Sequence, residues 1–420
     1  MSVDEFGVAD LSALEILDSR GNPTLRVSVE LSTGHRASAG VPSGASTGSR
    51  EAVELRDGDA DRYGGKGVLH AVANVNAELA ELLRSRTWSS LAEVDRAMND
   101  ADGTTNKGRL GANAIVGVSM ALARALAGTG ELYAYLRLDG ATPRLPVPHF
   151  NVLNGGAHAP NSLDFQEFMI APIGAPSLPE AVRAGATVYG RLRSLLKDRG
   201  FATGLGDEGG FAPDITRPED VLGLLVQAIE GAGYTAGRDG VAIALDPAAS
   251  EFYDAGSYRV AGESLTNADM IERYAQMVAD YPVWSIEDGL AEGDWDGWVA
   301  LTERLAGRAQ IMGDDIFVTN PAIITEAIGR KVGSSALIKL NQIGSVSETL
   351  EAMRLCRGAG YTQMVSHRSG ETEDSFIADL AVGTGCGQLK SGAPARGERV
   401  AKYNRLLQIA ATTDLPYGLA

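Results

Sequence analysis

The sequence contains very little cysteine: Cys356 and Cys386 are the only two among 420 residues. Their spacing matches neither a metal-ligand pair nor a disulfide framework. A fold built without disulfides is typical of reducing compartments, so we expect a cytoplasmic protein. Its stability must come from packing rather than from covalent cross-links.

Positive charge is also scarce. Lys and Arg number 37 against 54 Asp and Glu, which gives a formal net charge of −17. A protein that binds nucleic acid or an anionic membrane needs a basic face that displaces counterions. We therefore expect no nucleic-acid partner, and a small anionic substrate would need a local group of cations or a metal ion.

Long apolar runs are missing as well. No segment approaches the roughly 20 consecutive apolar residues that a membrane span needs. Residues 1–10 lack the basic start and the apolar run of a signal peptide. We therefore expect no membrane span.

The chain is long enough for two domains, because a single core usually stops growing below this length. Residues 11–32 alternate apolar and polar side chains around Gly21, Asn22 and Pro23, which predicts a hairpin, and residues 36–41 add a third strand. Helical spacing follows between residues 67 and 128. We predict an α+β domain over residues 1–140 and a second domain over residues 141–420, divided near the proline-bearing segment 140–148.

The second domain reads as a β/α repeat. From Pro146 onward, short apolar strands alternate with amphipathic helices, and each of six strands is followed by a polar or charged residue, in chain order Asp246, Glu287, Asp314, Lys339, His367 and Lys390. This pattern predicts a (β/α)8 barrel of TIM type, whose chemistry lies at the carboxyl ends of its strands. A single polar residue at the end of a strand is usually exposed to solvent and has no further role. Six in succession, of complementary types, are much harder to explain in this way.

Lys339 lies in the apolar run 336–344. If that run is a buried strand, desolvation favours the neutral amine, and Lys339 becomes a base that works near neutral pH. The alternative, an exposed lysine at the end of its strand, is weakened by the apolar residues on both sides.

Three successive strand ends carry carboxylates, Asp246, Glu287 and Asp314. Carboxylates this close repel one another unless a cation lies between them, and oxygen-only ligands suit Mg²⁺. Such an ion would also stabilise the charge formed when a base removes a proton next to a substrate carboxylate. The alternative is three separate acids in salt bridges.

A dehydration also needs an acid, and the glycine-rich stretch 206–211, after an expected strand near residues 203–205, offers Glu208. A partly buried carboxyl among others can keep its proton near neutral pH. Glu167, at the start of another apolar run, could share that proton or orient Glu208. Taken alone, either residue would more often be an ordinary surface acid.

Donors and positive charge are expected on the opposite side of the same face, from His367, Arg368, Ser369 and Lys390. Arginine and a small hydroxyl suit a phosphate or phosphonate group, although an inter-helix salt bridge is the weaker alternative. His158, on the glycine-rich stretch 154–159, is interpreted as a lid residue.

These motifs together resemble the enolase family. The stretches SGASTG, GANAIVGVSMA, GDEGGFAP, SIEDG, GDDIFVTN, KLNQIG, SHRSGETED and KSGAPAR occur in the family's order, and the resemblance runs from residue 17 to residue 404. It implies the α/β enolase fold, in which a small α+β N-terminal domain caps an atypical (β/α)8 barrel. It also implies reversible dehydration of 2-phosphoglycerate to phosphoenolpyruvate, a step of glycolysis, and a homo-oligomer, either a dimer or an octamer.

Roles follow from the resemblance position by position. Lys339 matches the base and Glu208 the acid, with Glu167 and His158 also in the catalytic set. Asp246, Glu287 and Asp314 match the ligands of one Mg²⁺, and Ser46, on a loop of small and hydroxylated residues, matches a ligand of a second Mg²⁺. The resemblance places the following residues against the substrate: His158, Gln166, Glu167, Lys339, His367, Arg368, Ser369 and Lys390.

Two alternatives stay open at this point. Pro160 stands in the lid where the family usually has Asp or Gly, which favours a related dehydratase of specialised metabolism that acts on a phosphonate or another analogue of 2-phosphoglycerate. The second alternative is a binding or scaffold role at a cell surface or in an RNA-processing complex.

Overall fold

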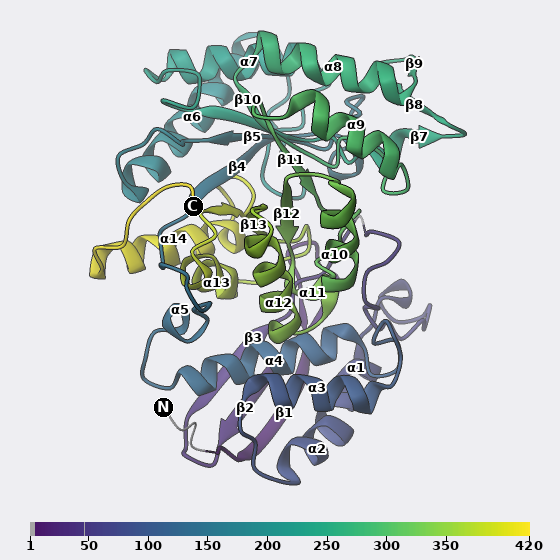
Figure 1. The fold of residues 1–420 in the computed structure, drawn as a ribbon, viewed down its shortest axis with the longest axis vertical. Coiled ribbons are helices and arrows are strands. Elements are labelled where there is room, and N and C mark those ends of the chain that lie inside the picture. Colours follow the sequence, from purple (N-terminus) through teal and green to yellow (C-terminus); the bar gives the residue numbers. More distant parts are fainter. Residues whose placement is uncertain (1–4, 46) are drawn as a thin grey trace.

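The computed structural model describes residues 5–45 and 47–420. Two parts follow one another along the chain: a sheet with helices, drawn in purple and blue in Figure 1, and a barrel drawn from teal to yellow. The predicted boundary between residues 140 and 141 falls in the connection between helix α5 (Leu132–Tyr135) and strand β4 (Val147–Asn154).

The first part confirms the predicted α+β elements. Strands β1 (Val8–Leu17), β2 (Pro23–Leu31) and β3 (Arg36–Gly40) form an antiparallel sheet in sequence order. A 3₁₀ turn (Tyr63–Gly65) precedes α1 (Leu69–Asn74), which continues through a π-helical turn (Val75–Leu79) into α2 (Ala80–Arg84); α3 (Leu91–Asp102) and α4 (Ala112–Ala127) follow. The sheet and these helices enclose the core of this part.

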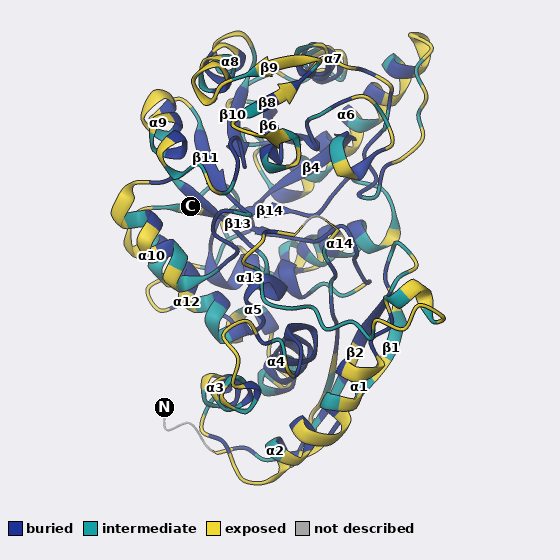
Figure 2. Cartoon of the chain, turned by 90° about the vertical axis from the view of Figure 1, so that its right-hand side faces the viewer, coloured by how far each residue is buried: buried dark blue, intermediate teal, exposed yellow. Residues whose placement is uncertain are grey.

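Helix α4 packs directly on the sheet because the residue at its middle, Gly117, has no side chain. A Cβ on Gly117 would lie 2.6 Å from Val27 Cγ2 and 2.9 Å from Val41 Cγ2. The absence of a side chain at this point brings the helix axis close to β2 and to the end of β3. The rest of α4 is almost wholly buried, in agreement with its nearly continuous apolar sequence (Figure 2).

The second part is a closed barrel of eight strands, confirming the predicted fold class. Around the barrel the order is β10, β11, β12, β13, β14, β4, β5, β6. The remaining strands are β5 (Glu167–Ala171), β6 (Ala242–Asp246), β10 (Val283–Glu287), β11 (Gln310–Gly313), β12 (Ser335–Ile338), β13 (Thr362–Ser366) and β14 (Gln388–Lys390). A small separate sheet is formed by β7 (Tyr253–Asp254), β8 (Ser257–Val260) and β9 (Glu263–Leu265).

Helices cover the outside of the barrel. They are α6 (Leu178–Asp198), α7 (Pro218–Gly231), α8 (Asn267–Asp280), α9 (Trp295–Leu305), α10 (Pro321–Arg330), α12 (Val346–Gly358), α13 (Phe376–Thr384) and α14 (Gly397–Thr412). The one-turn helix α11 (Leu340–Ile343) lies against α4 instead, and 3₁₀ turns occur at Gly156–His158 and Ala249–Phe252. None of the helices in the described part of the chain is both long and apolar enough to cross a membrane.

The barrel is atypical at its start. Strand β5 runs antiparallel to both of its neighbours, β4 and β6, and the two helices α6 and α7 follow it before β6 begins. Because β5 is reversed, its first residue lies at the same barrel end as the last residues of its neighbours: Glu167 pairs with Asn154 and Asp246. This reversal brings Glu167 to the face where the strand ends carry acids and bases.

Two local predictions were wrong. The run 336–344 is not one strand, because β12 ends at Ile338 and Lys339 precedes the short helix α11. Residues 203–205 do not form a strand, and Leu205 makes only an isolated bridge to Phe211. In both places the chain turns early, which leaves Lys339 and Glu208 on short connections at the barrel mouth.

Polar contacts join the two parts. Asp95 of α3 is buried, and its Oδ2 accepts hydrogen bonds from the Ser119 hydroxyl at 3.0 Å and from the Ser347 N–H of α12 at 3.0 Å. Lys107 pairs with Glu348 at 3.0 Å on the same barrel helix. The first part is therefore held to α12 by charged and polar groups as well as by apolar packing.

Candidate active site

The strand ends bring the predicted carboxylates together. Asp246 and Glu287 are the last residues of β6 and β10, which are neighbours, and Asp314 directly follows β11, the next strand around the barrel. All three residues are buried. Lys339 directly follows β12, so the predicted order around the barrel mouth is confirmed.

Lys390 lies among the carboxylates. Its Nζ is 2.8 Å from Glu287, 3.1 Å from Glu167 and 3.4 Å from Asp246. Strand β14, which carries Lys390, lies across the barrel from β10, and the Lys390 side chain reaches over the mouth to these carboxylates. Burial disfavours the ammonium, but the three carboxylates outweigh this effect and raise the pKa of Lys390 well above its usual value.

The carboxylate group has the chemistry of a cation site. Burial, followed by the nearby charge of Asp246, raises the pKa of Glu287 well above its ordinary value, as expected where acids crowd together without enough positive charge. Oxygen ligands from three neighbouring strands therefore fit a hard divalent cation.

The ligand atoms of the predicted trio are less tightly grouped than those of two other sets of described residues. His158, Glu167 and Glu208 form one such set, and Asp288, Asp314 and Asp315 form the other; within each set the ligand atoms all lie within 4.8 Å of one another. Lys390 and Lys339 contact this trio and supply positive charge to it. From the sequence we expected that a metal ion alone supplies this charge.

Lys339 is held by Asp314. Its Nζ donates a short hydrogen bond to Asp314 Oδ2, and Gln342 donates to Asp314 Oδ1 at 2.8 Å. The predicted shift of the Lys339 pKa was wrong in direction: burial does favour the neutral amine, but the carboxylate of Asp314 outweighs burial and the pKa is raised. Lys339 is therefore protonated wherever Asp314 keeps its full negative charge.

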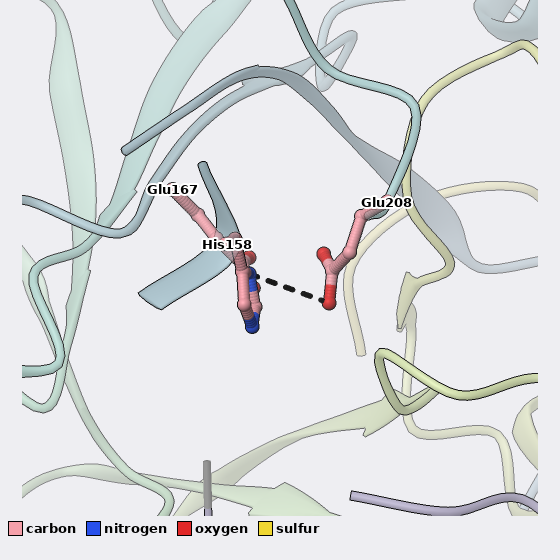
Figure 3. Close-up of side chains that lie close together, drawn as sticks. All are labelled: His158, Glu167 and Glu208. Carbon is pink, nitrogen blue, oxygen red and sulfur yellow. Dashed lines mark ion pairs between the residues drawn. The ribbon is translucent and has the colours of Figure 1, made fainter. Parts of the chain in front are cut away.

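A second group of acids surrounds His158. Its Nδ1 lies 3.6 Å from Glu167 Oε1 and 3.7 Å from Glu208 Oε1, and its Nε2 lies 2.9 Å from the Ser369 hydroxyl. Figure 3 shows the imidazole with the two carboxyl groups beside it. All four side chains are buried, and they come from the chain after β4, the start of β5, the turn 206–210 and the chain after β13.

The pKa values of the two glutamates are shifted in opposite directions. Burial and then the charge of Glu208 raise the pKa of Glu167 well above its ordinary value. For Glu208, burial is outweighed by His367 and His158 in their protonated forms and by Arg399, so its pKa is held well below the ordinary value. The lowered pKa contradicts, for the free protein, the expectation that Glu208 keeps its proton, whereas the sharing of a proton with Glu167 stays a prediction.

His367 and Arg368 have partners in the protein. His367 Nε2 lies 3.2 Å from Glu208 Oε2, and Arg368 donates to Glu51 and Asn341, each at 3.0 Å. His367 does not bring positive charge, because burial lowers its pKa to about 3. Ser369 donates to Glu208 Oε1 at 3.4 Å.

Several buried polar atoms in this region have no hydrogen-bond partner, among them His158 Nδ1, Gln166 Oε1 and His367 Nε2. Buried polar atoms are nearly always paired in folded proteins, so atoms left unpaired mark a place for a ligand or a proton. His158 Nδ1 faces both Glu167 and Glu208. The barrel mouth is thus built for a polar ligand and for proton transfer.

Comparisons with known proteins agree with this geometry. The family model described as "Enolase, N-terminal domain" matches residues 8–138, and that described as "Enolase, C-terminal TIM barrel domain" matches residues 142–414. An enolase of Rubrobacter xylanophilus is 58% identical over 399 residues, which cover 94% of this chain and 92% of the relative.

The chain belongs to the enolase family. It is a hydro-lyase, and its membership supports the predicted reaction, the dehydration of 2-phosphoglycerate. A divalent metal cofactor and a small phosphorylated substrate follow from the same membership.

Ser46, the predicted ligand of a second metal ion, lies outside the described residues. Pro160, the unusual lid residue, is exposed, whereas its neighbours His158 and Ala159 are buried. Asn161 then donates to the backbone carbonyls of Asn154 and Pro213 at 3.0 and 2.9 Å, which ties the segment after Pro160 to the barrel.

Several residues of this enolase site were missed from the sequence. Asn151 donates to Glu208 Oε2 at 2.9 Å, Glu51 pairs with Arg368, and Arg399 contacts His367. Asn151 could have been found, because it is a polar residue inside the buried strand β4. Glu51 and Arg399 gave no such signal, since charged residues on a loop and on an amphipathic helix are usually solvated.

Proposed function

We propose that this site interconverts 2-phosphoglycerate and phosphoenolpyruvate with Lys339 as base, Glu208 as acid and two Mg²⁺ ions as cofactors. The observation that carries the proposal is one continuous set of buried contacts at the barrel mouth. Lys390 links the carboxylates Asp246 and Glu287 to Glu167, and Glu167 leads through His158 to Glu208. Lys339 contacts Asp314, so base, cation site and acid all lie at the same barrel mouth.

Asp246, Glu287 and Asp314 would hold one Mg²⁺, and the family resemblance assigns Ser46 to the other. The buried, crowded carboxylates and the raised pKa of Glu287 support this assignment. When bound, Mg²⁺ supplies positive charge against the substrate carboxylate, which becomes more negative as the proton leaves carbon 2.

Lys339 removes the proton from carbon 2. To accept that proton, the amine must be neutral, and the ion pair with Asp314 is what keeps it charged in the free protein. Once the charge of Asp314 is shared with a cation, burial dominates and favours the neutral amine. Thus the binding of the cofactor and the activity of the base are coupled through Asp314.

Glu208 protonates the leaving hydroxyl. Glu167 and Glu208 lie on either side of His158 Nδ1, and their interaction makes them titrate as a pair. We assign one shared proton to the pair, held on Glu167 in the free protein and passed to Glu208 by way of His158. The unpaired Nδ1 acceptor supports this relay.

Arg368 and Ser369 bind the phosphoryl group, and Gln166 and Lys390 orient the rest of the substrate. Arg368 has the planar fork that matches phosphate oxygens, and Glu51 and Asn341 hold it in place. The unpaired oxygen of Gln166 offers an acceptor for a substrate hydroxyl.

Steady-state rates test the identity of the substrate. We expect kcat/KM for 2-phosphoglycerate to exceed that for its phosphonate analogue, in which a methylene replaces the ester oxygen, by at least tenfold. A reversed preference would reject 2-phosphoglycerate as the physiological substrate and support the related dehydratase that Pro160 suggested. Equal rates would also contradict the proposal, because they would mean that the site does not recognise the ester oxygen.

We further propose a cytoplasmic homo-oligomer, either a dimer or an octamer, with the division into domains at residues 140 and 141. Cys356 and Cys386 are both free and buried, which fits a reducing compartment. Leu14 and Leu17 are half exposed on β1, an edge strand, and such apolar side chains favour burial against another chain. Sedimentation equilibrium distinguishes monomer, dimer and octamer.

A further inference from the structure

Arg399 is a fully buried arginine in the first turn of α14. Burial of a guanidinium is costly, and a positive charge near a helix N-terminus is also opposed by the helix dipole. Glu398 lies 3.3 Å away and offsets part of this cost. The contacts on the other side of Arg399 explain why a cation is placed here.

Those contacts join two loops of the active site. Arg399 Nη1 donates to the backbone carbonyl of Arg368 at 2.6 Å, and Nη2 donates to those of Ser369 at 2.5 Å and Asp207 at 3.1 Å. The first two carbonyls belong to the loop after β13 and the third precedes Glu208. One rigid guanidinium therefore fixes the position of the loop carrying Glu208 relative to the loop carrying His367.

The same guanidinium selects the tautomer of His367. Arg399 Nη1 lies 2.6 Å from His367 Nδ1, and because arginine can only donate, Nδ1 must accept. The single proton of the neutral imidazole then sits on Nε2, which lies 3.2 Å from Glu208 Oε2. His367 stays neutral because burial, with the nearby charges of Arg399 and Lys390, outweighs the attraction of Glu208 and lowers its pKa to about 3.

This arrangement distinguishes the two oxygens of Glu208. Oε2 accepts from Asn151 at 2.9 Å and lies 3.2 Å from His367 Nε2, whose N–H makes no aligned hydrogen bond in the free protein, so the donors nearest to Glu208 lie on the Oε2 side. Oε1 faces the Ser369 hydroxyl at 3.4 Å and the unpaired His158 Nδ1 at 3.7 Å. A proton that arrives on Glu208 is therefore accommodated on Oε1 and not on Oε2.

We propose that Arg399 is a positioning residue that fixes His367 as a neutral Nε2–H donor and thereby places the acidic proton of Glu208 on Oε1. The proposal rests on the assignment of Glu208 as the acid. Arg399 acts through His367 and does not touch the substrate.

The packing around Arg399 agrees with this role. A Cβ on Gly392 would lie 2.7 Å from the carbonyl oxygen of Glu208 and 2.8 Å from Arg399 Cδ. Gly392 also has a φ of +75°, which only glycine adopts without strain. The stretch after β14 therefore leaves room for Arg399 to pass beside the backbone of Glu208.

The first test is the tautomer of His367 in the wild-type protein. With ¹⁵N-labelled histidine, and the signals assigned by their loss in His367→Gln, we expect an unprotonated Nδ1 and a protonated Nε2 at every pH from 5.5 to 8. An Nδ1–H tautomer, or an imidazolium that appears within this range, would overturn the proposal. This spectrum does not depend on turnover, so it separates the proposal from the proposed function.

The second test compares Arg399→Gln with Arg396→Gln. Arg396 is a matched control, because it also donates to the carbonyl of Asp207, at 3.0 Å, but its other partners are Gly206, Ser19 and Glu398 rather than His367. Both variants lose a guanidinium beside the turn that carries Glu208. Only the first loses the donor to His367 Nδ1.

For Arg399→Gln we expect dehydration to slow by roughly 10²-fold, the lower range of general-acid contributions, while exchange of the carbon-2 proton changes by less than about threefold. His367 should also begin to titrate, adding a second pH dependence to kcat that KM does not share. Arg396→Gln should keep the wild-type ratio of dehydration to exchange. Equal losses of dehydration and exchange in Arg399→Gln would mean that Arg399 has a merely structural role, which would overturn the proposal. If that variant does not fold, the tautomer of His367 in the wild-type protein still tests the proposal.

Discussion

Lys390 shows how single residues make this site possible. Its ammonium lies within 3.4 Å of three buried carboxylates, Glu167, Asp246 and Glu287, which would repel one another without it. Lys339 has the same relation to Asp314. The two lysines therefore differ in their contacts with the proposed ligands: Lys390 contacts two of them and Glu167, whereas Lys339 contacts Asp314.

Lys339→Ala tests the base. The variant should lose exchange of the carbon-2 proton with solvent, because Lys390, the other amine at the mouth, is held as an ammonium by Glu167, Asp246 and Glu287, while its affinity for Mg²⁺ stays within about threefold. The carboxylate of Asp314 remains in place and loses only a competing cation. Exchange is measured by loss of deuterium from carbon 2, and binding by titration calorimetry. Exchange at the wild-type rate would exclude Lys339 as the base.

Glu208→Gln tests the acid and separates the two halves of the reaction. We expect carbon-2 exchange to continue, whereas dehydration falls by about 10²–10⁴-fold, the usual contribution of a general acid. The amide is nearly the same size as the carboxyl and can still face Asn151 and His367. If Glu208→Gln and Lys339→Ala lost exchange to the same extent, the division of roles between the two residues would be wrong.

At the scale of helices and strands, the reversed strand β5 and the close packing of α4 are the features that place the site. Strand β5 brings Glu167 opposite Asp246. Helix α4 approaches the sheet through Gly117, with Val27 and Val41 at the contact. The second feature has a direct consequence for stability.

Gly117→Ala should destabilise the protein by roughly 1–2 kcal/mol, because the added methyl would overlap stiff, branched side chains in the core and this outweighs the better helix propensity of alanine. Gly190 in α6 is the matched control: it is exposed, and nothing lies within 4 Å of its Cβ position. Gly190→Ala should raise stability by up to about 1 kcal/mol. Urea unfolding measures both, and a stabilised Gly117→Ala would contradict the packing.

The placement of the three carboxylates at neighbouring strand ends could be predicted from the sequence, because it depends only on the order of strands and helices along the chain. Asp246, Glu287 and Asp314 follow successive short apolar strands, and the β/α repeat alone places them side by side. The position of Lys390 could not be predicted in this way. It depends on closure of the barrel, which sets β14 beside β4 and directs Lys390 toward residues more than a hundred positions earlier.

Protonation states were the least predictable part. The pKa directions of Lys339 and Glu208 depend on the titratable groups beside them, Asp314 in one case and His367 and His158 in the other, and the sequence does not reveal those distances. Similarly, the strand expected over residues 336–344 ends at Ile338, because the chain turns into α11 to present Lys339. Apolar composition alone does not distinguish a long strand from a strand followed by a buried helical turn.

At the scale of the whole molecule, the junction between the N-terminal part and the barrel carries a buried acid that is unrelated to the chemistry. Burial raises the pKa of Asp95 to about 6, although hydrogen bonds from Ser347 and Ser119 oppose this shift. The folded protein therefore binds a proton at Asp95 more tightly than the unfolded chain does. Stability from this group is fully present below the ordinary carboxyl pKa and is lost as the pH rises through about 6.

Asp95→Asn should remove this pH dependence. The shift of about two pKa units corresponds to roughly 3 kcal/mol, so the free energy of unfolding of wild type should fall by that amount relative to the variant between pH 4 and pH 7. Above pH 7 the two curves should run parallel. Urea unfolding at several pH values checks this, and a constant difference across the whole range would show that Asp95 does not titrate in the fold.

The most direct test of the whole account is the formation of enol-phosphate absorbance when the purified protein is mixed with 2-phosphoglycerate. With Mg²⁺ present we expect rapid product formation, which stops on addition of a chelator and returns when Mg²⁺ is restored. Folded, Mg²⁺-loaded protein that forms no product would contradict the central claim that Lys339, the carboxylates of β6, β10 and β11, and Glu208 together dehydrate this substrate.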